Sequence, residues 1–101
     1  MRVHYNSRLA RCLPSKFDAF AFGGSVYVKR GVAAQKLLLH EAQHVLQFRK
    51  YGKLGFLLRY LWYLLRYGYT HSPLEVAARN FAADRCAVYT LEENQRLLDT
   101  L

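Results

Sequence analysis

His40 and His44 lie four residues apart in the segment LLLHEAQHVLQF (37–48), and Glu41 directly follows the first histidine. On an α-helix, residues four apart share one face with their Cβ atoms roughly 5–6 Å apart, so both imidazoles can bind one metal ion. Glu41 points about 100° away around the helix, which places its carboxylate beside the ion. There it can accept a proton from metal-activated water. The spacing therefore predicts two zinc ligands and a general base.

A catalytic zinc ion usually has a third protein ligand and a water molecule. Its candidates downstream are His71, Glu75, Asp84, Glu92 and Glu93. Glu75 is favoured, because it falls in the first turn of a predicted helix. Ala78 and Ala82 follow it and permit close packing against the helix that carries the histidines. His71 is the alternative third ligand.

Two other roles compete for Glu75. It can complete a capping box with Ser72, or it can pair with Arg79 four residues later. The histidines have an alternative too, as ordinary residues of a helix without a metal. A buried pair of imidazoles is costly unless each is bonded to something, which favours the metal site.

The secondary structure predicted around these residues changes along the chain, from strands in the first third to helices after it. Aromatic and small residues alternate in FDAFAF (17–22), and SVYVKR (25–30) alternates with β-branched residues, as is typical of strands. Gly23-Gly24 between the two runs predicts a β-hairpin. Residues 2–5 predict a further short strand. Apolar residues at 37, 38, 42, 45 and 46 predict a helix over 33–51, ending near Gly52.

Further helices are predicted over 54–68, which ends at a glycine, and over 72–91. Ser72 suits the N-cap of the latter and Pro73 its first position. Residues 92–101 extend that helix or form a separate one. The predicted class is α+β, in one domain over residues 1–101: a small N-terminal hairpin or sheet, then three or four helices.

The segment 54–68 combines leucines and aromatic residues with Arg59 and Arg66, seven residues apart. The favoured interpretation is a core helix whose two arginines reach water. The alternatives are a helix that lies on a membrane surface, a helix that docks a partner, and one wall of an apolar specificity pocket.

Fifteen Lys and Arg against seven Asp and Glu give a formal charge of +8 at pH 7. This excess favours an anionic partner or membrane surface, or only aids solubility. No nucleic-acid-binding motif is recognised, so no specific nucleic-acid partner is expected. The oligomeric state is not predicted.

The first residues, MRVHYNSRLARC, lack the apolar run of a secretory signal, and no apolar stretch reaches the roughly 18 residues that span a bilayer. A cytoplasmic location is therefore expected. Cys12 and Cys86 are too few and too distant for a disulfide framework or a Cys-type zinc site. Two reduced thiols are expected, with a single bridge as the alternative.

The pattern FDAFAFGGSVYVKRG followed by LLLHEAQHVLQ resembles the minigluzincins, which are minimal gluzincin-type metallopeptidase domains with an HExxH motif. It is also similar to the metallopeptidase-like domain in core proteins of extracellular contractile injection systems. In those families a strand pair precedes the HExxH helix, and a later helix carries a zinc-binding glutamate. The resemblance covers about residues 17–50 and reaches 72–83 only through Glu75 and the alanines after it.

This resemblance implies a zincin-like fold and a zinc metalloendopeptidase. His40, His44 and Glu75 would bind one zinc ion, with Glu41 as the general base. An alternative is an inactive or latent zinc-binding module that docks within a larger bacterial or phage assembly. In a latent form, residues 92–101 would cover the cleft.

The resemblance also implies how an extended peptide or protein substrate would bind. The strand that contains Val26, Tyr27 and Val28 would be the edge strand that pairs with it. A tyrosine or histidine is further expected to stabilise the transition state. The candidates, just ahead of Glu75, are Tyr67, Tyr69 and His71.

Overall fold

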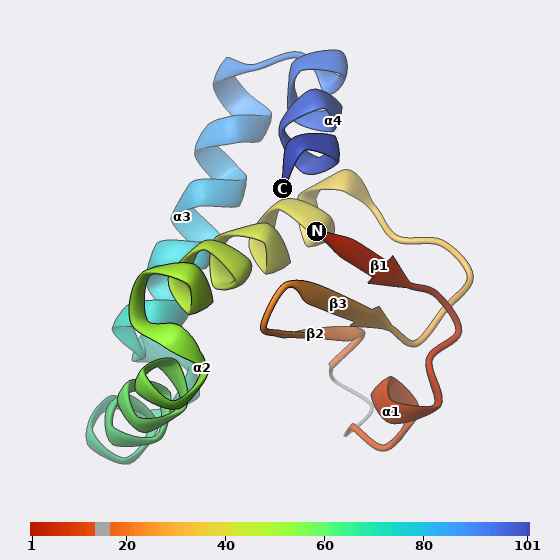
Figure 1. The fold of residues 1–101 in the computed structure, drawn as a ribbon. Helices are drawn as coiled ribbons and strands as arrows, with labels where there is room; N and C mark the ends of the chain where they lie inside the picture. Colours follow the sequence, from red (N-terminus) through yellow and green to blue (C-terminus); the bar gives the residue numbers. More distant parts are fainter. Residues whose placement is uncertain (14–16) are drawn as a thin grey trace.

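The computed structural model describes residues 1–13 and 17–101, which form a small N-terminal sheet followed by helices (Figure 1). This confirms the predicted α+β class. The elements in chain order are β1 (Arg2–His4), α1 (Arg8–Arg11), β2 (Ala19–Phe22), β3 (Ser25–Val28), α2 (Gln35–His71), α3 (Pro73–Val88) and α4 (Leu91–Thr100). The four-residue helix α1 was not predicted.

The predicted hairpin is present as β2 and β3. The two strands pair antiparallel with Ala19 opposite Val28, and Gly23 in the turn has a positive φ of 61°, which glycine adopts without strain. β1 pairs in parallel with the other side of β3, so the strand order is β1-β3-β2. β3 is therefore the central strand, and the prediction that it is an edge strand is wrong. Within the described sheet, the edge strands are β1 and β2.

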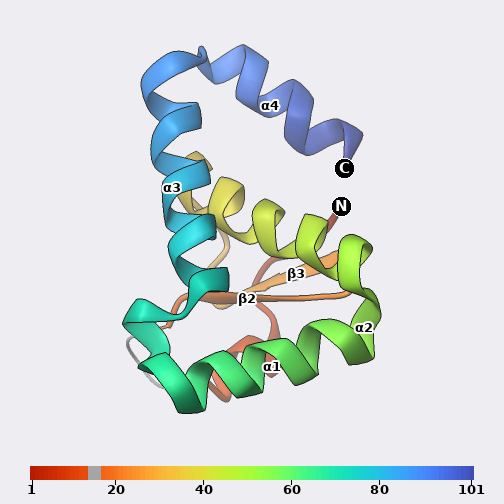
Figure 2. The same ribbon diagram turned by 90° about the vertical axis from the view of Figure 1, so that its left-hand side faces the viewer.

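Helix α2 contains two sharp bends, at Gly52 and Gly68. Both glycines have positive φ, 74° and 78°, and leave the helical conformation. They divide α2 into a first segment (35–51), a return segment (53–67) and a last short turn. Figure 2 shows the return segment running back below the first segment before α3 rises past it. The glycines thus end the two predicted helices close to where the sequence pattern predicted.

The first segment of α2 is packed from two sides. Val45 contacts the sheet through Val26 and Val28, and all three are at most 1% exposed. Leu39 and Ala42 belong to a second cluster, whose buried residues all come from helices. It also contains Leu38 from α2, Ala82 from α3 and Leu98 from α4. The segment that carries the histidines is therefore the centre of the molecule.

The return segment is not a core helix, so the favoured interpretation of 54–68 is wrong. Of its side chains only Phe56 is buried, whereas Leu58, Trp62 and Leu65 are 60%, 64% and 76% exposed. The sheet, α3 and α4 already cover most of the first segment. Only the narrow face of the return segment that carries Phe56 therefore packs against the rest of the protein. Arg59 and Arg66 do reach water.

The chain after Gly68 forms two separate helices. α3 begins at Pro73 and ends at Val88, and α4 has its own capping box between Thr90 and Glu93. Residues 92–101 therefore belong to a distinct helix, one of the two predicted alternatives. No helix within residues 1–13 and 17–101 is both long and apolar enough to cross a bilayer. Cys12 and Cys86 are free and exposed.

Candidate metal centre

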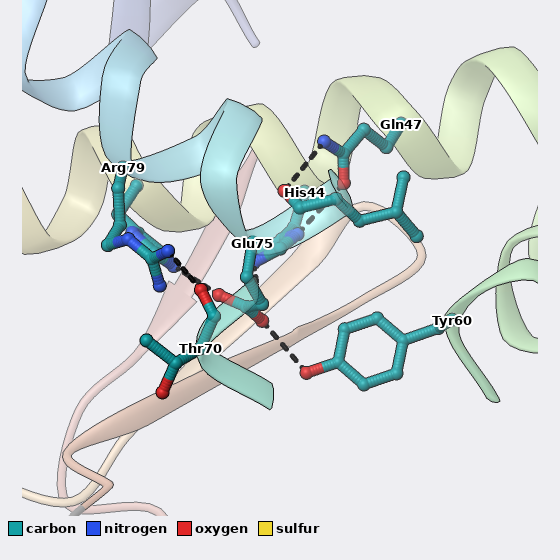
Figure 3. A network of polar contacts seen from close by, with 8 residues as sticks. His44, Gln47, Tyr60, Thr70, Glu75 and Arg79 are labelled. Atoms are coloured by element: carbon teal, nitrogen blue, oxygen red, sulfur yellow. Dashed lines mark hydrogen bonds and ion pairs between the residues drawn. The ribbon is translucent and has the colours of Figure 1, made fainter. Parts of the chain in front are cut away.

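His40, His44 and Glu75 come together between α2 and α3. The Nε2 atom of His40 lies 3.0 Å from Oε2 of Glu75, and Nε2 of His44 lies 3.2 Å from Oε1 of the same carboxylate. One candidate ligand atom from each of the three residues lies within 4.8 Å of the others. Figure 3 shows the Glu75 carboxylate directed from α3 toward His44. The structure thus brings together the three residues predicted as metal ligands.

The distances within the cluster can be compared with those around a small tetrahedral ion. Two atoms bound to one zinc ion at about 2.0 Å lie roughly 3.3 Å apart in tetrahedral geometry. The two nitrogen–oxygen distances, 3.0 and 3.2 Å, are close to that separation, and they run to the two different oxygens of the Glu75 carboxylate. Two imidazoles and one carboxylate are also a ligand set that leaves one position of a four-coordinate ion open. His40, His44 and Glu75 could therefore hold a metal ion.

Glu75 reaches the histidines because α3 starts close to α2 and packs tightly on it. The bend at Gly68 lets the chain turn, and Pro73 opens α3 two residues before Glu75. Ala78 and Ala82 on α3 are 0% and 1% exposed, so the two helices approach with little between them. The small residues have the packing role that the sequence suggested.

The competing roles of Glu75 are not observed. Ser72 is the N-cap residue of α3, but its side chain makes no capping hydrogen bond. The predicted capping box is therefore wrong, because the Glu75 side chain points to the histidines instead. Arg79 donates to the backbone oxygen of Thr70, as Figure 3 shows, and no ion pair joins it to Glu75 within the described residues.

Gln47 orients His44 from one helical turn further along α2. The Nδ1 atom of His44 lies 2.9 Å from Oε1 of Gln47, and Nε2 of Gln47 donates to the backbone oxygen of Leu74 at 3.2 Å. A histidine whose Nδ1–H is held by an acceptor presents Nε2 to a metal. Gln47 therefore holds the ring of His44 with Nε2 toward Glu75, and it links α2 to the start of α3.

Tyr60 is a site residue that was not predicted from the sequence. Its hydroxyl donates to Oε1 of Glu75 at 2.8 Å from the return segment, as Figure 3 shows. Its ring stacks on Phe56 with centroids 5.6 Å apart. The four-residue spacing of Phe56 and Tyr60 indicates that they share one face of a helix. It does not single out Tyr60 as a site residue, because the same segment contains other tyrosines with the same hydropathy.

The charges of the cluster shift the pKa values of its members. Burial by itself would raise the pKa of Glu75, but hydrogen bonds from His40, His44 and Tyr60 lower it well below its usual range. Burial acts to lower the pKa of His44, yet its bond to Glu75 and the nearby carboxylates outweigh this and raise it. His44 faces an acceptor with both ring nitrogens, so without a metal the ring favours the doubly protonated form.

Glu41 lies beside the cluster and is 5% exposed. Burial raises the pKa of its carboxyl above the usual value, and the charges of His44 and His40 oppose this shift. Glu41 does not belong to the cluster of ligand atoms, as its position on the helix predicts. Its carboxylate therefore lies next to the candidate ligands without being one of them.

Two cavities adjoin the cluster and share His40, Glu41 and Tyr69. The first has a volume of about 550 Å³, and its walls are mainly apolar, with Phe20, Phe48, Phe56, Leu57 and Leu64 among them. The second, of about 540 Å³, has polar walls that include Asp18, Lys36, Arg79 and Asn80. The first cavity is lined by all three candidate ligands, and the second is lined by His40.

The remaining predicted residues divide into those near the cavities and those away from them. Tyr69 lines both, and burial together with the charges of Glu75 and Glu41 raises its pKa to about 12. Tyr67 and His71 are exposed and line neither cavity. The other three candidate ligands, Asp84, Glu92 and Glu93, are exposed and lie outside the cluster.

The strand predicted to bind substrate also lies away from the cavities. Val26 and Val28 of β3 are buried in the core, and Tyr27 stacks between His4 and Phe20. The strand that lines the apolar cavity is β2, through all four of its residues. Residues 92–101 line neither cavity, so α4 does not cover the cluster.

Comparison of the chain with protein-family models, with curated proteins and with solved structures gave no match. The function of this centre must therefore be argued from its own residues.

Proposed function

We propose that this chain is a zinc-dependent metallopeptidase with a gluzincin-like centre formed by His40, His44 and Glu75, and with Glu41 as the general base. The observation that carries the proposal is the placement of Glu41. Its carboxylate is buried next to a three-residue ligand cluster, where two cavities meet. A metal site that only stabilises the fold is usually closed by a fourth protein ligand and needs no adjacent base.

Zinc is the ion that this ligand set suits, since His2Glu sites with an open position are typical of catalytic zinc. A bound zinc ion would lower the pKa of its water to about 7 and polarise the carbonyl of the scissile bond. The protein supplies the rest. Gln47 orients the His44 ring, and Tyr60 holds the Glu75 carboxylate in place.

Glu41 would act first as base and then as acid. It would accept a proton from the attacking water and deliver that proton to the amine that leaves when the peptide bond breaks. A carboxylate that exchanges protons near neutral pH needs a pKa above that of an exposed glutamate. Burial raises the pKa of Glu41 in this direction.

The substrate would be an extended segment of polypeptide that lies along β2. β2 is an edge strand of the described sheet, and Ala19, Phe20, Ala21 and Phe22 all line the apolar cavity. An extended peptide can add to such an edge by backbone hydrogen bonds. The apolar cavity would then accept a bulky apolar side chain next to the scissile bond. β2 thus takes the substrate-binding role expected earlier of β3.

Tyr69 would donate a hydrogen bond to the oxygen that becomes negative during the reaction. It is the one predicted stabiliser among Tyr67, Tyr69 and His71 that lines the cavities. With a pKa raised to about 12, its hydroxyl keeps its proton at neutral pH and can donate.

Zinc analysis combined with a peptide-library assay tests the proposal. We expect the wild type to bind one zinc ion and cleave peptides, and Glu41→Gln to keep the zinc but lose hydrolysis by at least about a hundredfold. His44→Ala should lose both. Glu93→Gln, which changes an exposed glutamate away from the site, is the matched control and should retain both.

The outcomes separate the two parts of the proposal. Zinc that stays bound at full occupancy in His44→Ala would refute the ligand assignment. Zinc bound by a wild type that cleaves nothing in the library would refute the peptidase. That second result would instead favour a zinc-binding module that docks in a larger assembly.

A further inference from the structure

The return segment presents an apolar face to solvent that no described residue covers. We call it the leucine face; it consists of Leu54, Leu57, Leu58, Leu61, Trp62 and Leu65, which are 71%, 45%, 60%, 54%, 64% and 76% exposed. These positions recur at spacings of three and four, so they lie on one side of the helix. A contiguous exposed apolar surface of this kind marks a binding site.

We propose that the leucine face docks onto the surface of an anionic phospholipid bilayer. The return segment would lie in the plane of the interface, with its leucines among the acyl chains. The opposite side of the same helix, with Phe56 and Tyr60, packs on the protein and stays in place. Docking therefore requires no unfolding.

Charge supports a lipid surface as the occupant. Lys53, Arg59 and Arg66 are exposed on the return segment, and no aspartate or glutamate occurs between Glu41 and Glu75. Arg59 and Arg66 lie three residues before and four residues after Trp62 in the sequence, on the side of the helix next to the indole. Their guanidinium groups lie over the rings of Tyr51 and Tyr67, 4.4 and 5.9 Å from the ring centroids. Long basic side chains beside an apolar face can reach lipid phosphates while the leucines are buried.

The same charges argue against a second copy of this chain as the occupant. Two leucine faces in contact would bring like-charged side chains of both copies together, in a chain with a net charge of +8.

The length of the return segment also fits a helix on the membrane surface. Fifteen helical residues measure roughly 22 Å, which is too short to cross an apolar core about 30 Å thick, so the segment would lie on the surface of the bilayer.

The face borders the apolar cavity. Leu57 and Leu64 line this cavity and are 45% and 36% exposed, so the cavity opens at the edge of the proposed membrane contact. A polypeptide segment at the membrane surface would be within reach of the metal centre. This consequence rests on the proposed function, whereas the docking itself does not.

Trp62 provides a direct test, because it is the only tryptophan of the chain. The full chain is mixed with vesicles of equal parts phosphatidylcholine and phosphatidylglycerol, or of phosphatidylcholine alone. We expect a blue shift of the emission and quenching by brominated acyl chains with the anionic vesicles. Both effects should weaken with neutral vesicles and with added salt. Emission that does not change with anionic vesicles would overturn the proposal.

Matched variants test the apolar part of the contact. Leu58→Ser combined with Leu65→Ser should lower vesicle binding in a sedimentation assay by about tenfold or more. Leu9→Ser combined with Leu91→Ser changes two leucines that are 61% and 75% exposed elsewhere, and it should bind as the wild type does. Equal losses in both double variants would refute docking through the leucine face.

A second pair tests the charges. Arg59→Gln combined with Arg66→Gln should lower binding to the anionic vesicles about thirtyfold. Arg8→Gln combined with Arg96→Gln removes two exposed arginines from other elements and should have a much smaller effect. An equal effect of the two pairs would mean that the net charge, and not this helix, attracts the chain.

Two further measurements separate this inference from its competitors. A dimer in solution with a blue-shifted Trp62 before lipid is added would assign the face to a second copy and overturn the proposal. The Glu41→Gln variant should bind vesicles as the wild type does. Docking and peptidase activity can therefore fail independently.

Discussion

The Nδ1 atom of His44 lies 2.9 Å from Oε1 of Gln47, and the amide of Gln47 in turn donates to the backbone oxygen of Leu74 at 3.2 Å. Three residue positions on two helices are thus coupled through one buried glutamine, which is 6% exposed. The coupling leaves Nε2 of His44 as the atom that faces Glu75.

Replacing this glutamine should weaken zinc binding without removing a ligand. We expect Gln47→Ala to raise the zinc dissociation constant by about 10–100-fold, as measured by competition with a chelator of known affinity. Gln43→Ala, one turn earlier on the same helix, is the control and should leave the affinity unchanged. An unchanged affinity in Gln47→Ala would mean that the His44 ring is held by its packing alone.

Tyr69 should matter for the rate of hydrolysis and little for metal binding. Tyr69→Phe keeps the ring that contacts Phe17 edge-on at 5.1 Å, but removes the hydroxyl. We expect kcat to fall about a hundredfold with little change in KM and full zinc content. Tyr67→Phe is the control, since Tyr67 lines neither cavity. A wild-type kcat in Tyr69→Phe would exclude it as the oxyanion donor.

Zinc binding should strengthen as pH rises. The pKa of His44 in the metal-free protein is raised above its usual value of 6.5, so its contribution to stability is fully present below about pH 6.5 and is lost as pH rises through the raised pKa. Zinc must displace the Nε2 proton, which costs most at low pH. The rise in Tm caused by zinc should therefore grow with pH across this range. A zinc effect on Tm that is independent of pH would contradict the protonated state of His44.

The N-cap of α3 should tolerate a change that normally destabilises a helix. Ser72 is fully buried, its Oγ makes no hydrogen bond to any residue that the structure describes, and α3 receives no side-chain cap. Ser72→Ala should leave the free energy of unfolding unchanged or increase it by up to about 1 kcal/mol. Thr90→Ala, which removes the intact capping box of α4, should lose about 1 kcal/mol.

Urea titrations of both variants check this difference. Equal losses in Ser72→Ala and Thr90→Ala would show that Ser72 caps α3 after all and that Glu75 is free to complete the box.

Local pattern was sufficient for the parts of the fold that depend on near neighbours. The spacing of His40 and His44 needs only a regular helix, and the helix needs only its own apolar periodicity. Gly52 and Gly68 interrupt α2 because their positive φ is easily reached without a Cβ atom. The β2–β3 hairpin likewise forms from adjacent residues around Gly23.

Pairing between distant segments was not accessible in the same way. The three residues of β1 pair with β3 across more than twenty intervening residues. Because of this pairing, β3 is the central strand of the sheet and not the edge strand that was predicted. A strand that short carries too little pattern to predict its partner. The apolar return segment has the same problem, since hydropathy cannot say whether another element will cover it.

The sequence by itself determined the two histidines, the adjacent glutamate and the helices that carry the candidate ligands, because each depends on spacing within one element. Only the tertiary structure decided between the roles of Glu75 and added Tyr60 to the site, across separations of 35 and 15 residues. The physical reason is burial. The imidazoles enclosed between α2 and α3 gain more from a charged hydrogen-bond partner than the start of α3 gains from a side-chain cap, and Glu75 contacts the imidazoles.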